Sequence, residues 1–244
     1  MNFAIIAAGE GSRLASEGIK DPKPLVQING EALIDRLIRI FMDNHAESIS
    51  IICNDLTHRV SAHLEHIKEY GLNDREVPLN YMVKTTPSSM HSLWHLSKLM
   101  PQGPFVLTTV DTIFSEQQFA RYIEAFQQSL AKGYDALMGV TPYVDDEKPL
   151  YVGTDPELNI TGYYDAQTNP PCQYISAGIY ALTANAQPVL NRCVQQGESR
   201  MRNFQRALVA QGLRLKAFNF GKVMDVDHAS DIAKAEAFIN ETHA

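Results

Sequence analysis

Apolar residues recur along the chain in two patterns that alternate with each other. Short apolar runs rich in β-favouring residues, typical of buried parallel strands, begin with Phe3–Ala8 (FAIIAA). Between these runs, apolar side chains return every three or four residues, as on one face of a helix. The strands expected from this pattern cover 3–8, 48–53, 80–83, 104–111 and 134–140, and the helices cover 33–44, 57–70, 88–100 and 115–130. Strands that alternate with helices predict an α/β fold with a mostly parallel central sheet covered on both faces.

The pattern changes after Pro142. Shorter strands are expected at 151–154 and 159–164, on either side of a turn at 155–157, and a longer one at 174–182. They predict a small antiparallel lobe at about 142–182, inserted in a single domain that covers 1–244. Two helices, two strands and a last helix complete the prediction, at 184–196, 200–211, 214–219, 222–227 and 230–241.

The composition narrows the class of protein. No apolar run has the length of a membrane span, and the amino terminus lacks the pattern of a signal peptide, so a cytoplasmic protein with no membrane partner is expected. The net charge is -7 without any basic run, which argues against a nucleic-acid partner. The three cysteines have no paired spacing and favour neither a disulfide framework nor a zinc site. The oligomeric state is left open, a homo-oligomer included.

The loop after the first strand carries glycines and positive charge. Gly9 and Gly11 allow backbone N–H groups to approach an anion, and Arg13 and Lys23 add cationic side chains. A dinucleotide-binding fingerprint is excluded because Leu14 stands at the third glycine position, and no Walker A string occurs. A long basic loop without a helix is expected instead, closed by a lysine between two prolines.

Aspartates stand at the ends of two expected strands. Asp111 closes the strand at 104–111, and ligands of open α/β sheets bind beyond such carboxyl ends. A metal-binding role is favoured for Asp111 over the alternative, a cap of the helix at 115–130. Asp225 and Asp227 alternate on the strand at 222–227, so they face the same side if that strand stays extended.

The glycine loop resembles the signature of nucleotidyltransferases that join a nucleoside triphosphate to a sugar phosphate. Ala7–Leu14 (AAGEGSRL) and Pro22–Leu25 (PKPL) match the family pattern A-A-G-x-G-[ST]-R-[LM] followed by P-K. The signature is similar also to that of phosphocholine cytidylyltransferase-like proteins and of molybdenum-cofactor-type NTP transferases. The resemblance implies a Rossmann-like, three-layer nucleotidyltransferase fold of the GT-A type with a small antiparallel insertion.

The same resemblance implies roles for individual residues. The glycine loop would wrap the triphosphate, and Arg13 and Lys23 would act as catalytic residues that neutralise phosphoryl charge. The residues expected to bind the nucleotide are Ala7, Ala8, Gly9, Gly11, Ser12, Ser88 and Ser89.

The closing segment of the chain resembles a second family motif. Met224–Ile232 (MDVDHASDI) is similar to D-V-D-T-P-E-D-L, in which an acid joins the strand-end aspartate on Mg²⁺. The resemblance implies that Mg²⁺ is the cofactor and that Asp111 and Asp227 hold it as catalytic residues, with Asp225 as the second choice beside Asp227. A His-Ala pair replaces the usual Thr-Pro, which weakens the signal for a helix start. The alternative role of Asp227 is an N-cap of the last helix.

The segments that would bind the base and the acceptor depart from the family pattern. Thr86 and Ser88 replace the Gln and Gly that read the base in uridylyl- and thymidylyltransferases, whereas Ser92–Trp94 (SLW) resembles a string of bacterial phosphocholine cytidylyltransferases and suggests CTP. Ser88 and Ser89 equally fit a helix N-cap.

The residues expected by resemblance to bind the acceptor are Asp165, Ser176 and Gly153. Tyr163–Asp165 stands in the place of F-x-E, and Ser176–Tyr180 in the place of N-A-G-I-Y. Packing of the antiparallel lobe explains these residues equally well.

The expected function is that of an EC 2.7.7-type enzyme. It would transfer NMP from an NTP to a phosphorylated small molecule, first of all a sugar 1-phosphate, giving an NDP-sugar and pyrophosphate. One alternative is a CTP-dependent cytidylyltransferase acting on phosphocholine or another nonsugar phosphate, and another is a catalytically silent nucleotide-sensing homologue. No acyltransferase or β-helix segment follows, so a second activity is not expected.

Overall fold

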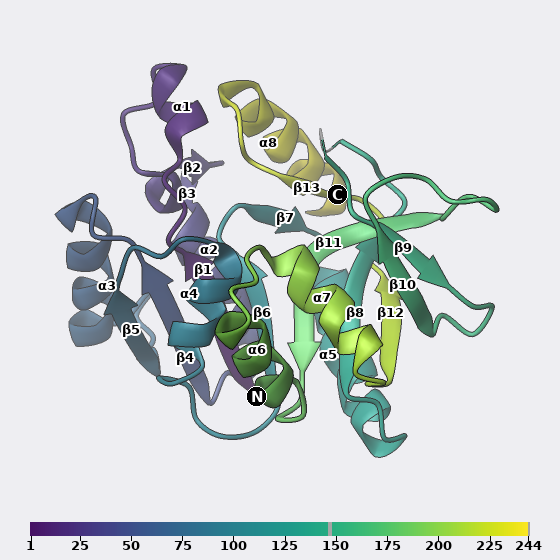
Figure 1. Cartoon of the computed structure of the whole chain (residues 1–244). Helices are drawn as coiled ribbons and strands as arrows, with labels where there is room; N and C mark the ends of the chain where they lie inside the picture. The colour runs from purple at the N-terminus through teal and green to yellow at the C-terminus, as the bar shows by residue number, and fades with distance from the viewer. Residues whose placement is uncertain (146–147, 244) are drawn as a thin grey trace. The chain divides into compact units, whose positions relative to one another are not determined.

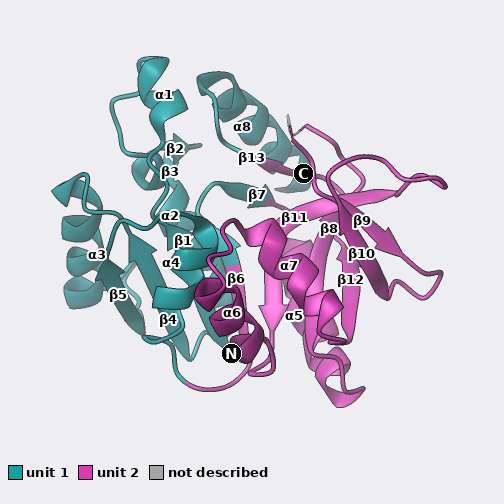
Figure 2. Cartoon of the chain, viewed as in Figure 1, with its two compact units in different colours: residues 1–101, 108–113, 225–244 teal, residues 102–107, 114–224 magenta. Residues whose placement is uncertain are grey.

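The computed structural model describes residues 1–145 and 148–243. The chain divides into two compact units, shown in teal and magenta in Figure 2. Unit 1 consists of Met1–Pro101, Thr108–Ile113 and Asp225–Ala244, and unit 2 of Gln102–Leu107 and Phe114–Met224. That the whole chain acts as one nucleotidyltransferase domain stays a prediction.

Unit 1 is built on parallel strands (Figure 1). Its elements are β1 (Asn2–Ala7), α1 (Ser12–Ser16), a 3-10 helix (Lys23–Leu25), β2 (Gln27–Ile28), β3 (Glu31–Ala32), α2 (Leu33–Asp43), β4 (Ser48–Cys53), α3 (His58–Tyr70), β5 (Leu79–Val83), α4 (Ser89–Leu96) and α8 (Ala229–His243). β4 pairs in parallel with β1 and with β5, and all six of its residues are buried. Burial of both faces explains the continuous apolar run of β1, whereas β4 also buries Ser48 and Ser50 and β5 is only partly buried.

Helices cover the strands of unit 1 through the apolar stripes seen in the sequence. α4 packs against β1 and β4, and α3 packs against β5. The ring of Phe3 in β1 stacks on that of Phe41 in α2, with centroids 4.4 Å apart. This packing anchors β1, whose carboxyl end leads into the glycine loop.

Unit 2 combines antiparallel and parallel pairing. Its elements are α5 (Glu116–Ala131), β8 (Ala136–Thr141), β9 (Tyr151–Thr154), β10 (Ile160–Tyr164), β11 (Tyr174–Leu182), α6 (Ala186–Gln195), α7 (Met201–Ala210) and β12 (Leu215–Asn219). β11 pairs antiparallel with β8 and β9, β9 pairs antiparallel with β10, and β12 runs parallel to β8. The antiparallel lobe predicted at 142–182 therefore lies within this unit.

Aromatic side chains fill the core of unit 2. α5 packs against β8 and β12, and its Tyr122 is fully buried beside Phe218 and Phe220. The Tyr122 hydroxyl donates a hydrogen bond of 2.6 Å to the carbonyl of Leu137, which satisfies its buried polar group.

Three further strands contain the boundaries between the units. They are β6 (Phe105–Thr109), β7 (Thr112–Phe114) and β13 (Val223–Asp225), of which β7 and β13 pair with each other. The predicted α/β class, with a mixed and mostly parallel central sheet, is confirmed. Among the described residues, no helix combines the length and the apolar character needed to cross a bilayer.

Three local predictions were wrong. The basic loop is not free of helix, because α1 and the 3-10 helix at Lys23–Leu25 lie within it. The helix predicted at 88–100 ends as α4 at Leu96. The last strand stops at Asp225, so Asp225 and Asp227 do not share one extended strand. α1 and the 3-10 helix are too short to show the apolar period by which a helix is recognised in a sequence, so the pattern did not predict them.

Candidate functional site

A hollow of about 540 Å³ opens in unit 1 beside the carboxyl end of β1. The residues that line it come from segments far apart in the chain: Ile6, Ala8, Gly9, Glu10, Gly11, Ser12, Arg13, Lys23, Thr86, Pro87, Ser88, Ser89, Ser92, Thr109, Val110, Asp111, Asp225 and Asp227. We call this the acidic hollow. It therefore gathers the glycine loop, both predicted cations and all three predicted metal ligands.

The glycine loop is held in place by close packing. Gly11 has a φ of +64°, and a Cβ at this position would lie 3.0 Å from the Cβ of Lys23. Only glycine fits both the left-handed backbone and this approach. The Asn54 side chain donates hydrogen bonds of 2.9 and 3.3 Å to the carbonyls of Gly9 and Ala8. Sequence reasoning missed Asn54, although a polar residue directly after a buried strand was a signal that could have found it.

Lys23 joins two of the predicted metal ligands. Its side chain is 9% exposed, and its ammonium donates to Oδ1 of Asp227 at 2.7 Å and to Oδ2 of Asp111. The guanidinium of Arg13 donates to the other oxygen of Asp227 at 3.2 Å. The structure thus brings together the four residues predicted as catalytic, and their catalytic role stays a prediction.

The electrostatics of the acidic hollow are dominated by its carboxylates. Burial alone would lower the pKa of Lys23, but the charges and hydrogen bonds of Asp111 and Asp227 outweigh it and raise that pKa. Asp225 reaches solvent within the hollow but is closely surrounded by protein atoms. This burial, together with the charges of Asp111 and Asp227, raises the pKa of Asp225 to about 8. At neutral pH the raised pKa favours the protonated form of Asp225.

The donor set suits a magnesium ion. Carboxylate oxygens are the ligands that Mg²⁺ prefers, and three of them line one hollow. Among the described residues, no group of three His, Cys, Asp or Glu side chains stands ready to hold a metal. The ammonium of Lys23 takes the position of a cation between Asp111 and Asp227, so an ion bound by both would replace it.

The charge balance gives a second test of this fit. Four acidic and two basic side chains line the acidic hollow, a net charge of -2 with all of them ionised. Even with Asp225 protonated, the acids outnumber the cations. A triphosphate would be repelled unless a cation accompanied it. The residues present therefore fit a nucleotide that binds together with a divalent ion.

The capping role considered for Asp111 belongs to another residue. Ser115 caps α5 by accepting a hydrogen bond of 3.4 Å from the backbone N–H of Gln118, so Asp111 is not the cap. Near the start of α8, the backbone N–H groups of Asp227 and His228 donate to Asp231.

His228 and Ala229, which stand in place of the Thr-Pro pair of the family motif, are both held by Glu17. The carboxylate of Glu17 accepts from the backbone N–H of Ala229 at 2.6 Å and pairs with the ring of His228 at 2.6 Å. Glu17 therefore ties the end of α1 to the start of α8. Nothing in the local sequence pointed to it.

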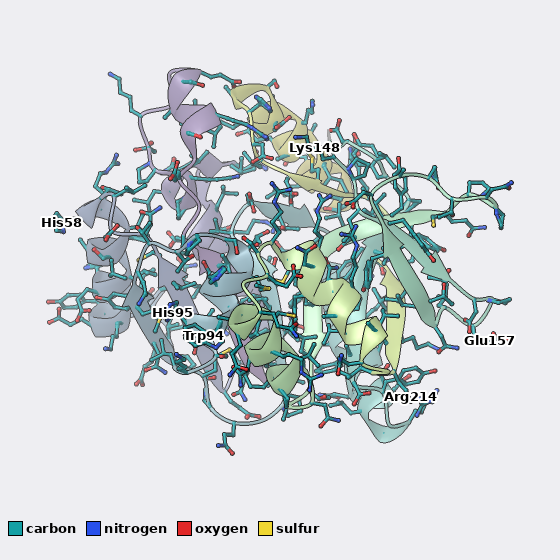
Figure 3. All side chains as sticks on the ribbon, viewed as in Figure 1. His58, Trp94, His95, Lys148, Glu157 and Arg214 are labelled. Atoms are coloured by element: carbon teal, nitrogen blue, oxygen red, sulfur yellow. The ribbon has the colours of Figure 1, made fainter. Side chains whose placement is uncertain are left out.

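The segment before α4 contains the helix cap that was considered for its serines, and the role of these serines in nucleotide binding stays a prediction. The Ser88 side chain caps α4 by accepting from the backbone N–H of His91 at 3.4 Å, and it also lines the acidic hollow. The hydroxyl oxygens of Thr86 and Ser92 lie 2.6 Å apart and form a hydrogen bond. Trp94 is not among the described lining residues, and its ring packs instead against His95, with centroids 4.7 Å apart (Figure 3). Polar hydroxyls thus dominate this wall of the hollow.

The remaining predicted residues are spread over different places. Ala7 is 2% exposed within β1, so only its neighbour Ala8 lines the acidic hollow. In unit 2, Asp165 lines one hollow and Gly153 another, and the hydroxyl of Ser176 accepts a hydrogen bond of 2.9 Å from Gln205. A Cβ at Gly153 would lie 3.0 Å from the ring of Tyr164, which gives this glycine a packing role.

The sequence and the fold of this chain were compared with those of known proteins. The family model described as Nucleotidyl transferase matches residues 4–242. Over 99% of the chain, 23% of residues are identical to the bifunctional protein GlmU of Methanococcus maripaludis, of which 55% is covered. The chain spans a quarter to just over half of the length of the curated relatives that it matches.

Solved structures share the fold. An inositol-1-phosphate CTP transferase from T. maritima matches with a TM-score of 0.77 and 17% identity, over 99% of this chain and 95% of that one. An apo UDP-glucose pyrophosphorylase matches with a TM-score of 0.80 and 15% identity, over 100% of both chains.

Proposed function

The chain belongs to the nucleotidyl transferase family, and from this premise we propose that it transfers NMP from an NTP to a phosphorylated small molecule and releases pyrophosphate. A sugar 1-phosphate is the first candidate acceptor, which would make the product an NDP-sugar. The observation that carries this proposal is the meeting of Lys23 and Arg13 with Asp111 and Asp227 beside the glycine loop.

The side chains of the acidic hollow suit this reaction. The phosphate of the acceptor is the nucleophile, and its second pKa of about 6 leaves it largely ionised at neutral pH, so no general base is required. Catalysis then depends on screening negative charge while the acceptor oxygen attacks the α-phosphorus and pyrophosphate leaves. Backbone N–H groups of the glycine loop would hold phosphate oxygens, and Arg13 and Lys23 would stabilise charge as it develops on them.

Asp111 and Asp227, with Asp225 beside them, would hold the metal. Bound Mg²⁺ supplies charge neutralisation for the triphosphate and polarises its phosphoryl oxygens. Lys23 would then be released from the two carboxylates and become available to the phosphates. The residue that links the carboxylates in this structure is therefore the one we assign to charge stabilisation.

A second candidate is transfer from CTP to a nonsugar phosphate such as phosphocholine. Ser92, the first residue of the string that resembles phosphocholine cytidylyltransferases, lines the acidic hollow. A silent nucleotide-sensing homologue is disfavoured because Arg13, Lys23, Asp111 and Asp227 are all retained.

A pyrophosphate-release screen tests the proposal. Each of the four NTPs is combined with Mg²⁺ and a panel of hexose 1-phosphates or phosphocholine. Turnover with a hexose 1-phosphate is expected, whereas turnover with phosphocholine and CTP alone would favour the second candidate. NTP binding without turnover for any pair would overturn the enzymatic proposal in favour of a sensor.

A further inference from the structure

A second hollow, of about 740 Å³, lies wholly within unit 2. It is formed around the first turn of α7, the segment before β9 and the segment after β10, and Lys148, labelled in Figure 3, belongs to its wall. Among its described lining residues, Lys148, Arg200, Arg202 and Arg206 are cationic and Asp165 is anionic, a net charge of +3. We call this the basic hollow. In a chain with a net charge of -7, such a concentration of cations points to an anionic ligand.

Two of the arginines are fixed by one carboxylate. The guanidinium of Arg202 donates to Oδ1 of Asp165 at 2.7 Å, and that of Arg206 pairs with Oδ2 at 2.7 Å. Backbone carbonyls complete the arrangement: Arg202 donates to Lys148 at 3.0 Å and Arg206 to Tyr163 at 3.2 Å. Side chains held in this way lose little conformational freedom when a ligand binds.

The two guanidinium groups remain able to bind a ligand. Their side chains are 27% and 33% exposed, and each guanidinium carries several N–H donors in a planar fork. Asp165, in contrast, has both oxygens occupied, and the neighbouring arginines lower its pKa. Asp165 therefore stays negatively charged and holds the guanidinium groups of the two arginines in position. The resemblance had implied a direct contact between this carboxylate and the acceptor.

The lining of the basic hollow also indicates which ligands it would reject. A phosphate group matches two adjacent guanidinium groups, and the hydroxyl of Ser199 offers a hydrogen bond to a hydroxyl group of the ligand. The side-chain amides of Gln167 and Asn203 line the basic hollow as well, but they form hydrogen bonds within the protein. A quaternary ammonium group is bound by several aromatic faces or by negative potential. Of the described lining residues only Tyr151 is aromatic, and the net charge is positive.

We propose that Arg202 and Arg206, aligned by Asp165, form an oxyanion-binding pair that selects a hydroxylated, phosphorylated acceptor over one that carries a quaternary ammonium group. This assignment rests on the proposed function, since it names the residues that bind the acceptor of that reaction. Arg202 and Arg206 are specificity-determining residues, and Asp165 is a positioning residue.

Binding to the full chain tests the proposal without requiring turnover. Glucose 1-phosphate and phosphocholine are titrated into the wild-type protein and into the variants Arg202→Gln and Arg206→Gln by isothermal titration calorimetry. Arg121→Gln is the matched control, because it removes the same charge from an exposed position of α5 in the same unit. Each hollow variant is expected to bind glucose 1-phosphate about tenfold more weakly, the loss typical of one charge-assisted hydrogen bond, while the control binds as the wild type does.

Steady-state kinetics separate this role from a structural one. The KM for the acceptor should rise about tenfold in both variants, while kcat and the KM for the NTP stay unchanged, and Arg202→Lys should restore part of the loss by keeping the charge. Thermal melting of each variant checks that it is folded.

Three results would overturn the proposal. The first is wild-type affinity for glucose 1-phosphate in a protein that carries both Arg202→Gln and Arg206→Gln. The second is tighter binding of phosphocholine than of glucose 1-phosphate, and the third is an equal loss in the Arg121→Gln control. Intact, arginine-dependent binding of glucose 1-phosphate in a protein that shows no turnover would overturn the proposed function and the acceptor role while supporting the anion site itself.

Discussion

The two hollows use the same pairing of cations with carboxylates in opposite proportions. In the acidic hollow, Lys23 lies between two carboxylates, and the described lining residues carry a net charge of -2 with all of them ionised. In the basic hollow, one carboxylate lies between Arg202 and Arg206, and the net charge of the described lining is +3. An excess of acids prepares a site for a cation, and an excess of bases prepares one for an anion. In each hollow, the side chain of the less abundant charge holds the side chains of the opposite charge in place: Lys23 holds two carboxylates, and Asp165 holds two guanidinium groups.

The largest effect is expected from breaking the acidic hollow. Lys23→Ala and Asp227→Ala should each reduce kcat by about 100-fold or more, because each removes a charge-assisted contact worth about 3 kcal/mol in the transition state. Initial rates of pyrophosphate release measure this loss. Lys68→Ala, at an exposed position of α3, is the control and should keep the wild-type rate. Wild-type rates in both hollow variants would contradict the site assignment.

Removal of divalent metal should affect ligand binding in the acidic hollow and leave ligand binding in the basic hollow unchanged. With excess chelator, turnover and tight NTP binding are expected to be lost, because three carboxylates then face the triphosphate without a compensating ion. Binding of glucose 1-phosphate to the basic hollow, measured by calorimetry in the same buffer, should not change. Loss of both kinds of binding would show that the charge comparison is wrong.

A smaller effect is expected from the glycine loop. Gly11→Ala introduces a side chain where φ is +64° and where its Cβ would lie 3.0 Å from that of Lys23. It should lower the free energy of unfolding by about 1–2 kcal/mol, the usual cost of a left-handed alanine. Chemical denaturation measures the change. Gly9→Ala is the matched control, since a Cβ there meets no atom within 4 Å and its φ is not positive.

The smallest expected effect lies outside both hollows, at the pair of His63 and Asp35. Their side chains are 2.6 Å apart, and the hydrogen bond with Asp35 raises the pKa of His63 in the folded state. The pair therefore contributes stability that is fully present below the unfolded pKa of about 6.5 and is lost as the pH rises through the higher folded pKa. Because His63 is partly exposed, the contribution should stay below about 1 kcal/mol.

The measurement is the difference in unfolding free energy between the wild type and His63→Gln across this pH range. The difference should shrink as the pH rises, while pyrophosphate release at a fixed pH stays the same in both proteins. A difference that grows with pH would show that the pairing has the opposite sign.

Much of the fold could be predicted from local pattern. The continuous apolar run of β1 and the isoleucine-rich run of β4 identified these two strands, whose faces are both buried. The three-to-four-residue period identified α2 and α5. The short elements escaped this reasoning. α1 has one buried residue, Leu14, and the 3-10 helix covers only Lys23–Leu25, so neither element is long enough to repeat an apolar residue at helical spacing.

The candidate site was predictable where a residue type is scarce and its position is marked by a motif. Glycine at position 11, lysine between two prolines and aspartates after strands all carried such marks. Glu17 carried no such mark, because its role depends on a partner 212 residues away in the chain. Asn54 directly follows a buried strand, but its partner Gly9 lies 45 residues away. Asp165 was identified, but its two arginine partners on α7 changed its expected role.

The sequence by itself determined the alternation of strands and helices and the family to which the chain is similar, because these follow from neighbouring residues. Only the tertiary structure decided the balance of charge in each hollow, since that balance depends on which distant side chains share one enclosed volume. Within such a volume the energy of a charge is set by its nearest partners, and sequence separation does not reveal them.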